Sequence, residues 1–335
     1  MKNIISDISN YINLFKEKYQ IGFFSENNNI FEYLEPYIEN KSKKHKIALI
    51  TFEEIEKKID NVKQFYFSNN FFKQLVFLTL NLKYLYSSTP GLNQNLFKKS
   101  KFSKCKYIYL QHSLCSMIMI YNKFAFDNFD AIQAVSNFQF NELKEIKNNR
   151  NLNYKIFKSD YLFLKKKNNT SKTKFKKSVL IAPTWNTSFF ALGCHDIICS
   201  LLKQNKISYD LRPHPMSFKK KEISIEELKT KDISININSN LNFSDYEILV
   251  SDWSGIFLEF AVLNKTIFLV DTPKKILNEE FRLYENYPAE IQFRDKFAKC
   301  FSIENLETLV EDIKKINFTS LEKNLNPVDK YYFEL

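Results

Sequence analysis

The chain has 335 residues, of which 44% are hydrophobic and 26% are charged, an ordinary composition for a soluble globular protein. This length exceeds that of a typical single domain and predicts two domains. The five cysteines form no CxxC pair and no secretory signal pattern opens the chain, which favours a cytoplasmic protein with reduced thiols. The net charge of +11 admits nucleic acid, an anionic membrane surface or anionic small molecules as partners. Because no zinc-finger, RNP or helix-turn-helix pattern accompanies the scattered lysines, we predict no nucleic-acid partner.

Short apolar runs alternate with longer amphipathic stretches along the whole chain, which predicts an α/β fold. Several of the runs are continuously apolar, as is typical of parallel strands buried on both faces. The predicted strands are residues 21–24, 47–51, 107–110 and 131–135 in the first half, and 179–182, 209–212, 247–250 and 266–270 in the second. Helices are predicted at 71–86, 137–147 and 256–263. The first of these is too polar to span a membrane and is interpreted as a buried helix.

The segment 164–177 separates the two halves. It holds seven lysines and no acidic residue, a composition typical of a solvated linker. We therefore predict an N-terminal α/β domain over residues 1–165 and a C-terminal α/β domain over residues 175–335. Two such domains form an interdomain cleft, and ligands bind at the carboxyl ends of the strands.

Two of the four histidines follow predicted strands. His112 comes directly after the strand at 107–110, where a neutral imidazole can accept a proton from a hydroxyl near neutral pH. His214 lies in Arg212-Pro213-His214-Pro215, a rigid turn that holds an imidazole beside a guanidinium. Arginine pairs with phosphate oxygens, and a donor imidazole offsets charge on a leaving group. A buried structural histidine and a structural turn are the respective alternatives.

A third feature follows the strand at 247–250, where Ser251, Asp252, Ser254 and Gly255 precede a predicted helix. Serine and aspartate are good helix caps, and glycine lets a ligand approach the backbone closely. A helix start with free N–H groups and hydroxyls binds phosphate. Glu259, about one turn further along, is placed to bind ribose hydroxyls. An ordinary capped helix is the alternative.

A fourth segment contains Thr184 and Trp185, which follow the strand at 179–182 and can line the same cleft. Several familiar patterns do not occur in the sequence. There is no DxD carboxylate pair, no GxGxxG or P-loop pattern, and no GxSxG or HExxH pattern. Single-domain metal-dependent sugar transferases, dinucleotide-binding enzymes, P-loop proteins and the common hydrolases are therefore disfavoured.

Together, the four segments in this order are similar to the CDP-glycerol glycerophosphotransferase family, the teichoic-acid and capsule polymerase and primase type. This resemblance implies a GT-B-like arrangement of two Rossmann-like domains, with members working at the inner face of the cytoplasmic membrane. It makes residues 1–165 the acceptor-side domain and residues 175–335 the nucleotide-donor-binding, Rossmann-like domain. It implies His112 as the general base and His214, with Arg212, as the group that stabilises the donor phosphate or the departing nucleotide. Gln111 and Ser113 are then acceptor-side residues, and Ser113 departs from the glycine that is typical there. The donor-binding residues implied are Thr184, Trp185, Arg212, Ser251, Asp252, Ser254, Gly255 and Glu259.

The resemblance implies transfer of a polyol phosphate from a CDP-activated donor to a hydroxyl of a cell-surface glycan or lipid-linked acceptor, with release of CMP. No cofactor and no metal is required, and the CDP-linked polyol is the substrate. A GT-B nucleotide-sugar glycosyltransferase or a nucleotide-sugar epimerase of similar fold is the alternative enzyme. A non-catalytic protein that binds lipid or polymer through its positive charge is a third hypothesis.

Overall fold

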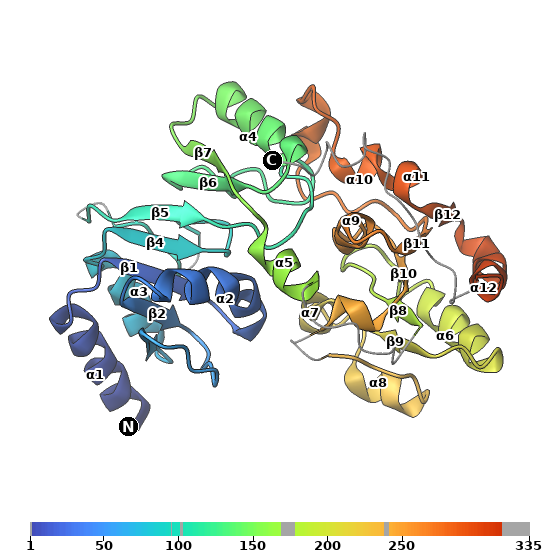
Figure 1. The fold of residues 1–335 in the computed structure, drawn as a ribbon, viewed down its shortest axis with the longest axis horizontal. Coiled ribbons are helices and arrows are strands. Elements are labelled where there is room, and N and C mark those ends of the chain that lie inside the picture. Colours follow the sequence, from blue (N-terminus) through green and yellow to red (C-terminus); the bar gives the residue numbers. More distant parts are fainter. Residues whose placement is uncertain (1, 95, 101–102, 169–177, 238–240, 317–335) are drawn as a thin grey trace. The chain divides into compact units, whose positions relative to one another are not determined.

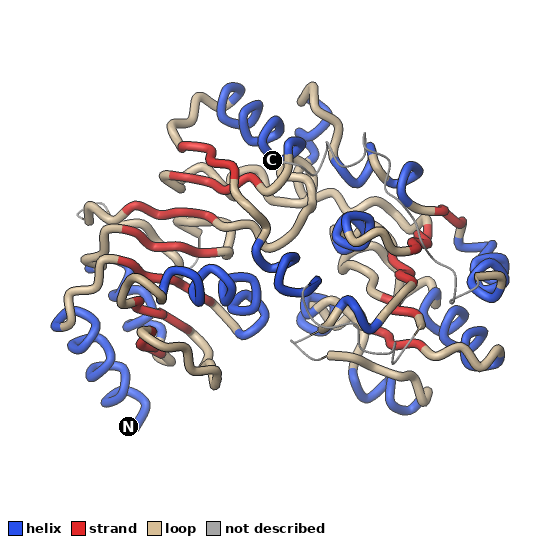
Figure 2. Tube along the Cα trace, in the orientation of Figure 1, coloured by secondary structure: helices blue, strands red, loops and turns tan. Residues whose placement is uncertain are grey.

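The computed structural model describes residues 2–94, 96–100, 103–168, 178–237 and 241–316, and these divide into two compact units (Figure 1). The first unit contains the described residues up to 112 together with 121–166. The second contains residues 113–120 together with the described residues after 166. Helices and strands alternate along the chain in both units (Figure 2).

The first unit is built on a seven-stranded parallel sheet with strand order β3-β2-β1-β4-β5-β6-β7. Its strands are β1 (Ile21–Ser25), β2 (Ile47–Thr51), β3 (Val62–Tyr66), β4 (Tyr84–Ser87), β5 (Lys106–Tyr109), β6 (Ala131–Ala134) and β7 (Lys155–Lys158). Its helices are α1 (Lys2–Lys16), α2 (Asn28–Ser42), α3 (Asn70–Thr79) and α4 (Asn137–Asn149), and α5 (Leu162–Asn168) begins in this unit and ends in the second.

Alternation along the strands divides the core of this unit into two faces. On one face, Phe23 and Leu49 pack in a cluster with Leu34 and Ile38 of α2. On the other face, Phe24 contacts Phe77 of α3 edge to face, with ring centroids 4.9 Å apart. Burial on both faces is the reason that these strands are continuously apolar.

The second unit has a five-stranded parallel sheet with order β12-β11-β10-β8-β9. Its strands are β8 (Val179–Ile181), β9 (Tyr209–Leu211), β10 (Ile248–Ser251), β11 (Thr266–Val270) and β12 (Lys299–Phe301). Its α-helices are α6 (Cys194–Gln204), α7 (Pro215–Lys219), α8 (Ile225–Thr230), α9 (Ile256–Val262), α10 (Ala289–Gln292), α11 (Arg294–Phe297) and α12 (Leu306–Lys314), and its 3-10 turns are η1 (Phe243–Asp245), η2 (Glu279–Leu283) and η3 (Ile303–Asn305). Helices α6 and α12 pack on one face of the sheet and α9 on the other (Figure 1).

The eight strands predicted from the sequence are confirmed to within about a residue at each end. Strands β3, β4, β7 and β12 were not predicted, because most of their residues are partly or fully exposed and they do not form continuously apolar runs. The helix predicted over 71–86 is wrong beyond Thr79, where the chain turns into β4, and it is not fully buried because Phe71 and Leu78 are exposed.

Residues 164–168 of the predicted linker are helical, as part of α5, and 169–177 lie outside the described residues. No helix within the described ranges combines the length and the apolarity that a membrane span needs. All five cysteines are free thiols.

Candidate functional site

The carboxyl edge of the second sheet brings together the site residues predicted in this unit. Strands β9, β8 and β10 are parallel neighbours, so the residues that follow them lie along one edge. Arg212 and His214 follow β9, and Thr184 and Trp185 follow β8. The rings of Trp185 and His214 lie with their centroids 6.4 Å apart.

The end of β10 is tied to the end of β8 by buried hydrogen bonds. Asp252 is completely buried and accepts from the Thr184 N–H at 2.8 Å and from the Thr187 hydroxyl at 2.6 Å. Burial raises the pKa of Asp252 to about 6. The hydroxyl of Ser251 donates to the Ala182 carbonyl at 2.6 Å. Ser251 and Asp252 therefore point into the protein. Their hydrogen bonds hold the end of β10 against the residues that follow β8.

Ser254 and Gly255 are partly exposed at the start of α9, whereas Glu259 is buried within that helix. A Cβ atom built on Gly255 would lie 2.5 Å from Oγ of Ser113 and 3.0 Å from Cβ of Cys115. Glycine is needed here because residues from much earlier in the chain approach its backbone. Ser113, expected in the N-terminal domain, therefore lies with the second unit.

The segment 113–120 is held in the second unit by further hydrogen bonds. The N–H of Ser116 donates to Oε1 of Glu290 at 2.9 Å. Asn278 donates through its side-chain amide to the Ile118 carbonyl at 2.9 Å, and the Leu277 N–H donates to the Met119 carbonyl at 3.0 Å. This segment, which starts immediately after His112, is thus part of the unit that carries the predicted donor residues.

The His214 side chain caps α7, because its Nδ1 accepts from the Met216 N–H at 3.0 Å. A ring whose Nδ1 accepts carries its proton on Nε2, so Nε2–H is a hydrogen-bond donor. The preceding Arg212 is anchored through its backbone N–H to the Ile181 carbonyl, at 2.8 Å. The Arg-Pro-His-Pro turn therefore presents the His214 Nε2–H as an oriented hydrogen-bond donor. This agrees with the rigid turn expected from its two prolines.

In the first unit, His112 lies at the end of β5 among aromatic rings. Its Nδ1 is 2.9 Å from the Tyr109 hydroxyl, which itself donates to the Tyr121 hydroxyl at 3.4 Å. The ring of Tyr33 on α2 contacts the imidazole, with centroids 5.7 Å apart. In the tautomer in which Nδ1–H donates to the Tyr109 hydroxyl, Nε2 carries a lone pair. A neutral His112 in this tautomer is suited to act as a base.

Gln111 is completely buried in the first unit. Its backbone N–H donates to Oε1 of Gln133 on β6 at 2.9 Å, and its side-chain amide donates to the Gln133 carbonyl at 2.7 Å. This reciprocal pair joins the ends of β5 and β6. Gln111 was predicted to face the acceptor. Its side chain instead links β5 to β6, next to His112. His112 and His214 belong to different units, so that their approach to one substrate remains a prediction.

Sequence reasoning missed three buried charged residues at the edge of the second sheet. Arg294 donates to the carbonyls of Asp252 and Val270, at 2.7 and 2.8 Å, and to the Asp271 carboxylate at 2.7 Å. It ties the end of β10 to the end of β11, and its guanidinium lies 4.2 Å from the ring centroid of Trp253.

The other two missed residues are Lys275, which follows β11, and Glu290, at the start of α10. Burial lowers the pKa of Lys275 to about 8 and raises the pKa of Glu290 to about 7. A lysine among 49 basic residues carries no local sequence signal that marks it as buried.

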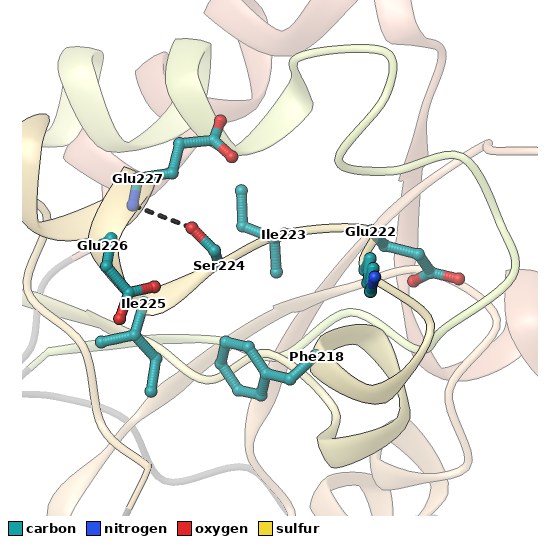
Figure 3. A pocket seen from close by; sticks show the side chains of 8 residues that line it. Phe218, Glu222, Ile223, Ser224, Ile225, Glu226 and Glu227 are labelled. Atoms are coloured by element: carbon teal, nitrogen blue, oxygen red, sulfur yellow. Dashed lines mark hydrogen bonds between the residues drawn. The ribbon is translucent and has the colours of Figure 1, made fainter.

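A hollow of about 430 Å³ in the second unit is lined by residues 218 and 221–227 (Figure 3). Its lining is one local stretch between α7 and α8, in which the hydroxyl of Ser224 accepts from the Glu227 N–H. It contains none of the predicted site residues, and its acidic side chains Glu222, Glu226 and Glu227 repel an anionic substrate. We therefore place the candidate site at the sheet edge. Among the described residues, no group of three or more histidine, cysteine or carboxylate side chains is placed to bind a metal ion.

Comparison with solved structures identifies the wall teichoic acid polymerase TagF as similar to this chain. A histidine-to-asparagine variant of TagF soaked with CDPG for 30 minutes has a TM-score of 0.59 at 11% identity, over 99% of this chain and 88% of that one. A histidine-to-alanine variant has a TM-score of 0.56 at 12% identity, over the same shares of both chains. At such identity the likeness concerns the fold, and it confirms the predicted α/β class with two Rossmann-like domains of the GT-B-like type.

No curated protein matches the sequence. The family model that matches is described as CDP-Glycerol:Poly(glycerophosphate) glycerophosphotransferase, and the match covers residues 152–317. This range includes the whole sheet of the second unit and every predicted donor-binding residue, and it begins after His112. The family expected from the sequence is confirmed as the one that this chain matches: residues 152–317 are similar to the CDP-glycerol:poly(glycerophosphate) glycerophosphotransferases.

Proposed function

We propose that the protein transfers glycerol phosphate, or a related polyol phosphate, from a CDP-activated donor to a hydroxyl of a cell-surface glycan or lipid-linked acceptor. CMP is the other product. One observation supports this most directly: Arg212, an oriented His214 and Trp185 follow neighbouring strands at a single sheet edge, inside the residues that match the family. The Nε2–H group of His214 and the guanidinium of Arg212 suit a diphosphate.

The proposed reaction is an in-line displacement at the β-phosphorus of the donor. The acceptor oxygen forms a bond to this phosphorus while the bond to the bridging oxygen breaks, and CMP leaves with that oxygen. The acceptor proton passes to Nε2 of His112, which requires His112 to reach the bound donor. Arg212 and His214 offset the charge that develops on the departing phosphate. Positioning and charge stabilisation supply most of the rate enhancement, and the general base contributes about a hundredfold.

A donor panel tests this function directly. The full chain is incubated with CDP-glycerol, CDP-ribitol, a UDP-sugar and a GDP-sugar, with a glycan acceptor, and the products are followed by phosphorus NMR. Release of CMP together with a new phosphodiester signal supports the proposal. Release of UDP or GDP, or epimerised UDP-sugar, identifies the alternative enzymes. Parallel reactions with EDTA test whether the transfer of the polyol phosphate proceeds without a divalent metal ion.

Replacing Tyr109 with phenylalanine is expected to lower kcat about tenfold, because the hydroxyl that orients Nδ1 of His112 is lost. The donor KM should change by less than about twofold, since Tyr109 lies in the first unit and the predicted donor residues lie in the second. Tyr11→Phe is the matched control, because that hydroxyl bonds Thr79, on α3. Equal kcat values for the two variants would show that Tyr109 does not position His112.

We also propose that the protein contacts the inner face of the cytoplasmic membrane. Helix α1 carries a stripe of exposed isoleucines, with exposed fractions of 46% at Ile4, 68% at Ile5, 42% at Ile8 and 44% at Ile12. Their spacing places them on one side of a helix, while Asp7 and Leu14 of α1 are buried. An exposed apolar stripe on a protein with a net charge of +11 suits a surface of anionic lipid.

The double substitution Ile5→Glu and Ile8→Glu is expected to reduce binding to anionic lipid vesicles at least about tenfold, because it removes apolar area and adds negative charge. Vesicle sedimentation measures this effect. Ser6→Glu with Ser9→Glu is the control, since it adds the same charge at exposed positions beside the stripe. Equal binding by the two double variants, or a stable dimer that only Ile5→Glu with Ile8→Glu dissociates, would contradict the membrane role.

A further inference from the structure

Lys275 is a buried cation with few partners. Only 5% of the residue is exposed, and its Nζ donates to Oγ1 of Thr184 at 3.0 Å. The ammonium also lies 4.6 Å from the ring centroid of Trp185. An ammonium group has three N–H donors, and in the described part of the chain no carboxylate lies within 4.0 Å of this one. Lysine is rarely buried without a counter-ion, because the loss of hydration is unfavourable.

The two buried acids of this region are engaged elsewhere. Asp252 uses one oxygen for the Thr184 N–H and the other for the Thr187 hydroxyl. Glu290 accepts from the Ser116 N–H through Oε1, while its Oε2 is buried without a hydrogen bond. Burial raises the pKa of Glu290, which favours its neutral form. Asp252, Glu290 and Glu222 therefore act on the charge of Lys275 only at longer range than an ion pair.

The position of Lys275 links it to the candidate site. It lies in the loop after β11, which is the neighbour of β10 in the parallel sheet. Lys275 contacts Thr184 and Trp185, which follow β8 and were predicted as donor-binding residues. Trp185 also approaches His214, so the lysine, the tryptophan and the histidine form one continuous group.

We propose that Lys275 is a donor-binding residue that supplies hydrogen bonds and positive charge to the phosphate oxygens of a nucleoside diphosphate, with Thr184 and Trp185 holding its ammonium in place. The proposal rests on the proposed function and adds a residue to that site. A buried charge without an ion-pair partner destabilises the free protein. A bound phosphate supplies the missing acceptors, which explains why a lysine is present at this position.

A purely structural lysine makes the opposite stability prediction. If Lys275 served to tie the β11 loop to Thr184, its removal would destabilise the protein. If it serves a ligand, Lys275→Met should leave the unliganded protein at least as stable as the wild type, because an unpaired buried charge is replaced by an apolar chain of similar length. Lys274→Met is the matched control, since Lys274 is its exposed neighbour in the same loop.

The experiment combines thermal unfolding with calorimetric titration of CDP and of cytidine. For Lys275→Met we expect an unchanged or higher Tm without ligand, a Kd for CDP that is weaker by about tenfold or more, and an unchanged Kd for cytidine. Lys275→Gln, which keeps an N–H donor without the charge, should show the same loss. Lys274→Met should bind CDP like the wild type.

A Kd for CDP within twofold of the wild-type value in a folded Lys275→Met protein would overturn the inference while leaving the proposed function intact. A lower Tm without ligand in both Lys275 variants, with CDP binding retained, would assign a structural role instead. If the wild type binds UDP or GDP and not CDP, the proposed donor is wrong. The same comparison with the nucleotide that binds then decides the role of Lys275.

Discussion

Replacing His112 with alanine is expected to reduce turnover of CDP-glycerol at least about a hundredfold while the protein remains folded. When its Nδ1–H donates to Tyr109, the imidazole has a lone pair on Nε2 that can accept the acceptor proton. The Kd for CDP should stay within about twofold of the wild-type value, because the predicted donor residues lie in the second unit. Steady-state kinetics with phosphorus NMR, together with calorimetric binding of CDP, measures both quantities.

His45→Ala provides the matched control for this variant. His45 is exposed in the turn before β2, and its removal should leave turnover unchanged. A pH profile adds a second readout, since the limb of the kcat profile that reports deprotonation of the general base should disappear in His112→Ala. Near-wild-type turnover in this variant would remove His112 from the mechanism.

Replacing His214 with serine is expected to lower turnover by a similar factor, at least about a hundredfold, through loss of the Nε2–H donor at the departing phosphate. Serine is chosen because the histidine also caps α7 through Nδ1. A serine hydroxyl can accept from the Met216 N–H and so preserves the cap, which is worth about 1 kcal/mol. The Tm should therefore stay close to that of the wild type.

His214→Ala separates the two roles of this side chain. It removes the cap as well as the donor group, so it should lose the same turnover as His214→Ser and in addition unfold at a lower temperature. If His214→Ser keeps wild-type turnover and only His214→Ala is impaired, the histidine is a structural cap and the charge-stabilising role must be assigned to Arg212.

Many site residues at the edge of the second sheet could be predicted from the sequence, because they come directly after strands. Buried parallel strands are continuously apolar, and the polar groups that follow them are local signals next to an easily recognised element. Thr184, Arg212 and His214 were found in this way. The inward orientation of Ser251 and Asp252 was not visible, because a capping residue and a buried turn residue have the same local pattern.

The sequence by itself determined the α/β class, eight strands and the histidines at strand ends, since these depend on hydrophobic periodicity over a few neighbouring residues. Only the tertiary structure decided that residues 113–120 belong with the second unit and that Lys275 and Glu290 are buried. These features depend on contacts such as that between Ser116 and Glu290, which are 174 positions apart. Burial of a charged side chain is decided by what packs around it from distant parts of the chain, and such packing leaves no pattern in the residues beside it.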